Sequence, residues 1–127
     1  MPIILKRAYD NPDQNDGYRV LVDRLWPRGL SRDDAGLDEW MKEVAPSPEL
    51  RKSFHAGRLN WDTFRKGYLS ELKNHRERLK PLVQRAEKER VTLVYSASDT
   101  DHNNAVVLKQ YLKMLVNGTA SSAKRST

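Results

Sequence analysis

The sequence contains no cysteine among its 127 residues. This excludes disulfides, thiolate metal sites and cysteine nucleophiles, and a thiol-free composition fits a reducing compartment. Long apolar runs are also missing, since no window approaches the roughly 18 apolar residues of a membrane span. The apolar run Ile3–Leu5 before Lys6 is too short for a signal peptide. We therefore expect a cytoplasmic domain that does not associate with membranes.

Several catalytic and nucleic-acid signatures are absent as well. The sequence has no G-x-S-x-G nucleophile elbow, no P-loop and no G-x-G-x-x-G. It also lacks helix-turn-helix spacing, an aromatic ribonucleoprotein motif and a zinc finger. The net charge of +6, from 23 basic and 17 acidic residues, attracts polyanions only weakly and does not identify a nucleic-acid binder.

Two segments are strongly typical of buried strands. Tyr18–Trp26 and Val91–Tyr95 have continuous apolar centres, which suit strands covered on both faces. Ile3–Leu5 is a shorter β-type segment, and the turn formers of Asn11–Gly17 indicate a hairpin or a wide loop. Because helical patterns separate the two strong strands, we expect them to pair in parallel, adjacent or one strand apart. The fold class predicted is α/β, a compact three-layer Rossmann-like domain with a mainly parallel sheet.

The helical patterns lie between and after these strands. Ser47 and Asn60 are expected to cap helices that begin at Pro48 and at the Trp61–Leu72 stripe. Pro81 either opens or kinks a helix carrying Leu79 to Ala86, and a last helical stripe covers Leu108 to Leu115. Leu37 to Val44 fits a helical face, although a strand remains open there. We expect a single domain over residues 1–117 and a disordered tail over residues 118–127, which have only small and polar side chains.

The first candidate site is the string Asp23–Gly29, at the carboxyl end of the first strong strand. Ligands of open α/β sheets bind beyond the carboxyl ends of strands. Arg24 and Arg28 could bind a phosphate or carboxylate through forked hydrogen bonds, with Asp23 orienting one of them or acting as a base. The structural alternative is that Asp23 pairs with an arginine, Trp26 is part of the core, and the rest turns the chain.

The second candidate site is the polar loop Ser96–Asn104, between the last strand and the last helix. A helix amino terminus presents free N–H groups, so polar side chains here could line a small-ligand pocket. The alternative is that Asp99 or Asp101 caps the helix while His102 points to solvent. The spacing of these side chains matches no standard metal site, so no metal is expected.

Longer strings resemble a known family, the YeaO-like branch of domain-of-unknown-function family 488. The strings are DGYRVLVDRLWPRGLSR, LDEWMKEVAPSPELRKSF, NWDTFRKGYLSEL and LVYSASDTDHNNAVVLKQYL. The resemblance implies a compact α/β fold with Rossmann-like layering and no established activity. Other branches look as if they carry cysteines in the loop after the last strand. This chain has no cysteine in that loop, so no thiol chemistry transfers to it. YeaO-like proteins are also expected to have Asn-His before Ala-Val, where this chain has Asn103 and Asn104.

These observations favour a domain that binds a small anionic molecule, with acid–base catalysis as an extension and no cofactor. The helix start after Asp101 should complete the pocket formed by the arginines. The ligand-binding candidates are Arg24, Trp26, Arg28, Ser96, Asp99 and Asn103. The catalytic candidates are Asp23, Asp99 and His102.

Two other functions stay open at this point. The protein could be a nucleic-acid-associated accessory protein that binds through the basic segment Arg76–Arg90, which has six basic and three acidic residues. A face around Trp40 or Trp61 could instead dock a partner protein. The sequence does not indicate the oligomeric state.

Overall fold

The computed structural model describes residues 3–125, with side chains described as far as residue 117. The strands are β1 (Ile3–Arg7), β2 (Tyr18–Leu21), β3 (Glu39–Trp40) and β4 (Val91–Tyr95). The helices are α1 (Arg32–Ala35), α2 (Pro48–His55), α3 (Trp61–Lys73), α4 (Arg76–Lys88) and α5 (Asn104–Arg125). Two short 3₁₀ turns, η1 (Gln14–Asp16) and η2 (Lys42–Val44), complete the described elements.

The four strands form one parallel sheet in the order β1-β4-β2-β3. β4 lies between β1 and β2, so Val91 is level with both Ile3 and Tyr18. The predicted parallel pairing of the two strong strands is confirmed, and they are direct neighbours. β2 is shorter than expected, because the regular strand ends at Leu21 and only the N–H of Val22 still reaches the Val94 carbonyl, at 3.0 Å.

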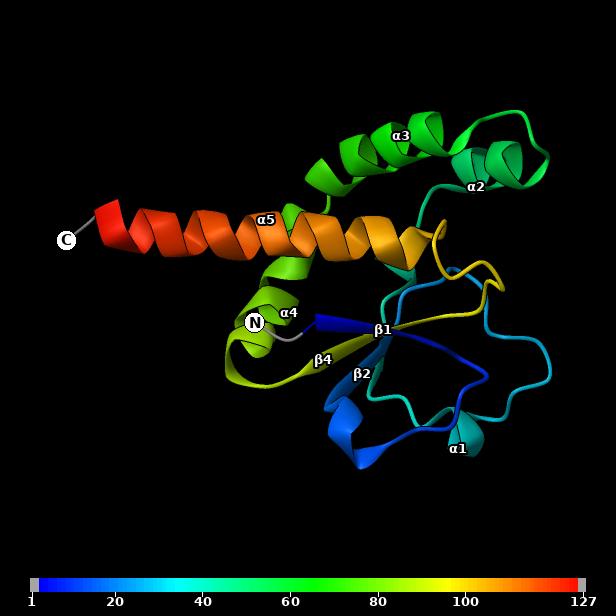
Figure 1. Ribbon diagram of the computed structural model, residues 1–127, viewed down its shortest axis with the longest axis horizontal. Coiled ribbons are helices and arrows are strands. Elements are labelled where there is room, and N and C mark those ends of the chain that lie inside the picture. The colour runs from blue at the N-terminus through cyan, green and yellow to red at the C-terminus, as the bar shows by residue number, and fades with distance from the viewer. Residues whose placement is uncertain (1–2, 126–127) are drawn as a thin grey trace.

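The helices cover the sheet unequally. Figure 1 shows α2, α3 and α5 on one side of the sheet and the short α1 on the other. The main core lies under the long helices and takes alternate strand residues such as Val20, Leu93 and Tyr95. On the other face, Leu21 and Val94 are covered by loop residues that include Trp26 and Trp40. The α/β class is confirmed, and its second covering layer consists mainly of the irregular segment 22–38.

The helix boundaries follow the capping residues in the sequence. The Ser47 side chain accepts a hydrogen bond from Leu50 N–H at the start of α2, and Asn60 does the same for Thr63 N–H at the start of α3. Pro81 does not open its helix, because α4 already begins at Arg76.

The segment from Leu37 to Val44 is not a helix. It consists of the two-residue β3 followed by η2, because the Leu21 carbonyl takes the N–H of Met41 and so holds this backbone to the sheet. Asn11–Gly17 forms a wide loop containing η1 and not a hairpin, since β4 separates β1 from β2.

α5 runs to Arg125, but its side chains beyond residue 117 and residues 126–127 lie outside the described part. The disordered tail over residues 118–127 therefore stays a prediction. Within the described residues, no helix combines the length and the apolar character needed to cross a membrane.

Gly17 joins η1 to β2 in a backbone conformation that favours glycine, with φ 68° and ψ −133°. A Cβ at this position would lie 2.1 Å from the carbonyl oxygen of Arg90, which also accepts the Tyr18 N–H. We expect Gly17→Ala to lower the free energy of unfolding by about 2 kcal/mol, measured by urea denaturation, since strain and a backbone clash add together. Gly57→Ala is the matched control: Gly57 also has positive φ but open space around it, so this variant should lose about half as much. Equal losses would mean that the contact with Arg90 is unimportant.

Candidate functional site

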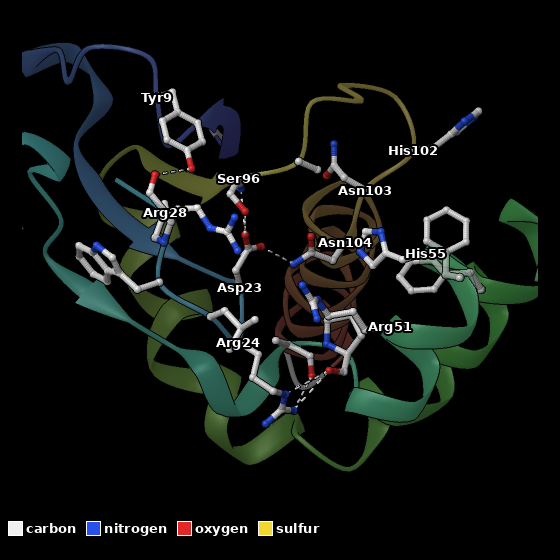
Figure 2. Close-up of a pocket in the computed structure, with 18 residues that line it drawn as sticks. Tyr9, Asp23, Arg24, Arg28, Arg51, His55, Ser96, His102, Asn103 and Asn104 are labelled. Atoms are coloured by element: carbon white, nitrogen blue, oxygen red, sulfur yellow. Dashed lines mark hydrogen bonds between the residues drawn. The ribbon is translucent and has the colours of Figure 1, made fainter. Parts of the chain in front are cut away.

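The two polar loops predicted from the sequence meet at the carboxyl edge of the sheet, and Asp23 joins them. One carboxylate oxygen of Asp23 accepts the Ser96 N–H at 2.9 Å and the Ser96 hydroxyl at 2.6 Å. The other oxygen accepts the Asn104 side-chain amide at 3.0 Å, and that amide also donates to the Val22 carbonyl at 2.9 Å. Figure 2 shows the hydrogen bonds of Asp23 to Ser96 and Asn104, which link the loop after β2 to the loop after β4 and to the start of α5. Because β2 and β4 pair side by side, the loops that follow them are neighbours.

Among the described residues, Asp23 forms no ion pair with an arginine, contrary to the structural alternative and to the idea that it orients Arg24 or Arg28. Its role as a base stays a prediction. The hydrogen-bond donors to Asp23 are Ser96, in the loop after β4, and Asn104, the first residue of α5. Neither Arg24 nor Arg28 is in an ion pair with it among the described residues. The geometry explains this outcome, because the side chain of Asp23 points across the sheet edge toward β4 and the following helix.

A cavity of about 300 Å³ opens beside this junction. Asp23, Ser96 and Asn104 contribute to its lining at the loop junction. The β2 loop adds a second wall, and residues of α2 and α3 form a third. The principal lining side chains from these two walls are Arg24, Trp26, Arg28, Arg51, Phe54, His55 and Phe64.

Three arginines from two different elements line the cavity. Arg24 donates to the carbonyls of Ala45 and Pro46, with donor–acceptor distances of 3.3 Å (Figure 2). Arg28 is exposed, and Arg51 is partly buried on α2. None of the three guanidinium groups has a carboxylate partner within residues 3–117. The cavity therefore carries positive charge that internal acidic groups do not neutralise by direct pairing.

Asn103 is the residue that caps α5, and not Asp99 or Asp101 as the structural alternative expected. The Asn103 side-chain oxygen accepts the N–H of Val106 at 3.1 Å, while its amide donates to the Asp99 carbonyl at 2.8 Å. Asn103 is buried, with 3% of its surface exposed, so both of its polar atoms are satisfied inside the protein.

Asp99 closes the turn before the helix. One of its carboxylate oxygens accepts the N–H groups of Asp101 and His102 at 2.9 and 3.0 Å. These two backbone hydrogen bonds lower the pKa of Asp99 below its ordinary value, since they favour the ionised form. His102 is exposed and lies 4.8 Å from the Trp61 ring, centre to centre. In Figure 2 it lies at the rim of the cavity and points away from Asp23.

Most of the sequence-predicted site residues line the same cavity. The ligand candidates Arg24, Trp26, Arg28, Ser96 and Asn103 do so, as do the catalytic candidates Asp23 and His102. Asp99 does not line it and is exposed in the loop behind. Trp26 contributes only part of its side chain to the cavity lining, because its indole N–H donates to the Leu30 carbonyl and its ring packs against Trp40.

The residues that sequence reasoning missed come mainly from α2. Arg51, Phe54 and His55 lie three and four positions apart, which places them on one helix face, and all three line the cavity. This spacing was visible in the sequence, but nothing local showed that the face turns toward the sheet edge. Glu71 of α3 fixes that orientation, since its carboxylate accepts the N–H and hydroxyl of Ser47 at 2.8 and 2.6 Å.

Within the described residues, no group of three or more histidine, aspartate or glutamate side chains is placed to hold a metal ion. Burial raises the pKa of the Tyr95 phenol above its ordinary value, so this ring stays neutral at the carboxyl end of β4.

The basic segment and the tryptophan faces are already engaged in intramolecular contacts. On α4, Arg78 pairs with Glu39, Lys80 with Glu77, and Arg85 with Glu89. Trp40 donates to the Asp23 carbonyl at 2.7 Å, and Trp61 packs on the rings of Phe54 and Phe64. Nucleic-acid binding and partner docking remain predictions from the sequence.

A four-stranded parallel sheet, covered mainly on one face and with a cationic cavity at its carboxyl edge, defines a small α/β domain. The chain belongs to the DUF488-N3i family, described as "Inactive DUF488-N3 subclade", whose model matches residues 2–127. It is 51% identical over 115 residues to the Uncharacterized protein YeaO of Escherichia coli K12, covering 91% of this chain and all of that protein. It is 39% identical over 106 residues to Rv3073c of Mycobacterium tuberculosis H37Rv and to Mb3100c of Mycobacterium bovis, covering 84% of this chain and 89% of each relative. No solved structure matches the chain significantly.

Proposed function

We propose that this protein binds a small anionic molecule in the cavity at the carboxyl edge of its sheet. The observation that carries the proposal is the set of three cavity-lining arginines, Arg24, Arg28 and Arg51, without carboxylate partners among the described residues. Guanidinium groups form strong, forked hydrogen bonds with phosphate and carboxylate oxygens. The Arg24 guanidinium donates to the Ala45 and Pro46 carbonyls, so an anion would chiefly supply acceptors for the guanidinium donors of Arg28 and Arg51.

The start of α5 adds to this positive environment. Asn103 and Asn104 line the cavity at the amino terminus of the helix, where the helix dipole favours negative charge. Asp23 is the opposing negative group, but its carboxylate already accepts three hydrogen bonds from Ser96 and Asn104. The proposed role of Asp23 is therefore to hold the two loops together, while the arginines contact the ligand.

Binding is proposed ahead of catalysis for two reasons. The word "Inactive" in the family description favours a binding role. Of the catalytic candidates, Asp99 lies outside the cavity lining and His102 lies at the exposed rim. Acid–base work by Asp23 would have to compete with the hydrogen bonds that this residue makes across the sheet edge. A cytoplasmic location remains part of the proposal.

Titration with inorganic phosphate or sulfate tests the proposal. We expect saturable thermal stabilisation and chemical-shift changes that centre on the cavity in the millimolar range or below. Arg51→Gln and Arg28→Gln should each weaken binding about tenfold, because each removes a charge-assisted contact without removing the fold. The experiment reads the dissociation constant by NMR.

Arg58→Gln is the matched control, since Arg58 is exposed in the loop between α2 and α3 and does not line the cavity. It should bind the anion like the unaltered protein. If all three variants weaken binding equally, the anion is attracted by net charge alone. No binding by the unaltered protein would show that the arginines have only a structural role.

A further inference from the structure

The cavity is larger than a simple inorganic anion requires. Its volume of about 300 Å³ falls at the lower end of the range for pockets that hold small organic molecules. Phosphate alone would engage the arginines and leave the remainder of this space to water. The size therefore indicates an organic ligand, and the chemistry of the remaining wall indicates its class.

That remaining wall is aromatic. Phe54 and Phe64 stack with their ring centres 4.3 Å apart and their planes 20° from parallel. His55 lies next to Phe54, with ring centres 6.0 Å apart, and all three rings line the cavity. Phe64 is buried, whereas Phe54 is only partly covered and His55 is exposed, so part of this wall remains exposed. Aromatic faces of this kind bind flat rings by stacking or edge contacts.

The charge and the aromatic wall are close together on one helix. Arg51 precedes Phe54 and His55 by three and four residues on α2, so their Cβ atoms lie about 5–6 Å apart along one face. In Figure 2 the side chains of Arg51 and His55 both enter the cavity beside Asn104. A ligand that contacts both would carry its charge close to its flat portion.

Resting on the proposed anion pocket, we infer that its ligand is a compact organic anion in which the charged group is joined directly to a flat ring. The arginines, chiefly Arg51 and Arg28, hold the charged group. The ring lies against Phe54, His55 and Phe64. Aromatic phosphates and aromatic carboxylates share this chemistry.

Three probes of equal charge type separate this inference from the proposed function: inorganic phosphate, phenyl phosphate and cyclohexyl phosphate. We expect phenyl phosphate to bind about tenfold more tightly than inorganic phosphate, because burying one ring face removes apolar surface from water. Cyclohexyl phosphate should bind less tightly than phenyl phosphate, since a puckered ring cannot stack on Phe54. Benzoate should compete with phenyl phosphate. Dissociation constants come from NMR titration or calorimetry.

Phe54→Leu tests the aromatic wall while keeping an apolar side chain of similar length. It should reduce the advantage of phenyl phosphate over inorganic phosphate to less than threefold. Tyr18→Leu is the control, because Tyr18 is a partly buried aromatic residue at the amino end of β2, away from the cavity lining. The ratio between the two ligands should be the same in this control as in the unaltered protein.

A measurement on the unaltered protein covers the case in which Phe54→Leu does not fold. Intermolecular nuclear Overhauser effects should connect phenyl phosphate protons with ring protons of Phe54 or His55. Equal affinity for phosphate, phenyl phosphate and cyclohexyl phosphate would overturn the inference and leave the anion pocket standing. Failure of all four anions to bind would overturn the proposed function itself.

Discussion

Replacing Asp16 with asparagine should lower the free energy of unfolding by about 3–5 kcal/mol, because it leaves a buried arginine without its counter-charge. Asp16 and Arg19 are both nearly inaccessible, with side-chain exposures of 5% and 4%, and their charged atoms are 2.6 Å apart. Lys6 adds a second cation at 3.1 Å. Arg19 also donates to the carbonyls of Ala35 and Gly36, so this cluster fastens α1 and the η1 loop to the sheet.

The same cluster sets a pH dependence. Burial alone would raise the pKa of Asp16, but hydrogen bonds from the Asp13 backbone, Lys6 and Arg19 outweigh it and lower the pKa below its ordinary value. The ionised carboxylate therefore stabilises the fold fully above its unfolded-state pKa of about 4, and this contribution is lost as the pH falls through the lower folded-state value. The difference between the unaltered protein and Asp16→Asn should shrink below about pH 4.

Urea denaturation between pH 3 and pH 7 measures both effects. Asp33→Asn is the matched control, since Asp33 is exposed in α1 and forms no ion pair among the described residues. It should change the free energy of unfolding by no more than about 0.5 kcal/mol. If Asp16→Asn lowered the free energy of unfolding as little as Asp33→Asn does, the cluster would not be what fastens α1 and the η1 loop to the sheet.

The sequence supports the fold most firmly where one physical signal dominates. The continuous apolar centres of the segments around Val20 and Val94 have no good alternative to buried parallel strands, and both form. Pro48 after Ser47 is equally specific for a helix start, which the structure confirms. At Leu37 to Val44 the signal is ambiguous, because helical spacing of apolar residues also arises where a short strand turns into a 3₁₀ segment.

For the candidate site, too, some features could be predicted from the sequence and others could not. Its location could be predicted, because two chemically rich loops follow two strands whose carboxyl ends must lie at one edge. The partners could not, because Asp23, Arg24 and Ser96 each had several chemically suitable neighbours within reach. The direction in which each side chain points decides which neighbour it hydrogen-bonds. It also decides that Asn103, and not Asp99, caps α5. Arg51 was missed because its position depends on the docking of α2 against Glu71, which is a long-range contact.

Removing the carboxylate that joins the two loops should be the most damaging single change at the site. Asp23→Ala leaves the Ser96 N–H and the Ser96 hydroxyl without their acceptor, and it removes one of the two acceptors of the Asn104 amide. Each unsatisfied donor in a partly buried place costs about 1 kcal/mol or more, so we expect a total loss of about 3 kcal/mol in the free energy of unfolding. Asp33→Ala, which removes an exposed carboxylate, should cost far less.

A double-mutant cycle with Asn104→Ala shows whether the loss at Asp23 comes from this link between the loops. Asn104 donates to both Asp23 and the Val22 carbonyl, so its replacement alone should cost about 1–2 kcal/mol. Once Asn104 is alanine, Asp23→Ala removes one fewer interaction, and the double variant should be more stable than the two single losses predict by about 0.5–1.5 kcal/mol. The free energies come from urea denaturation of the four proteins at pH 7. If the two losses of free energy were strictly additive, Asp23 and Asn104 would stabilise the protein independently. Other contacts would then join the two loops at the edge of the sheet.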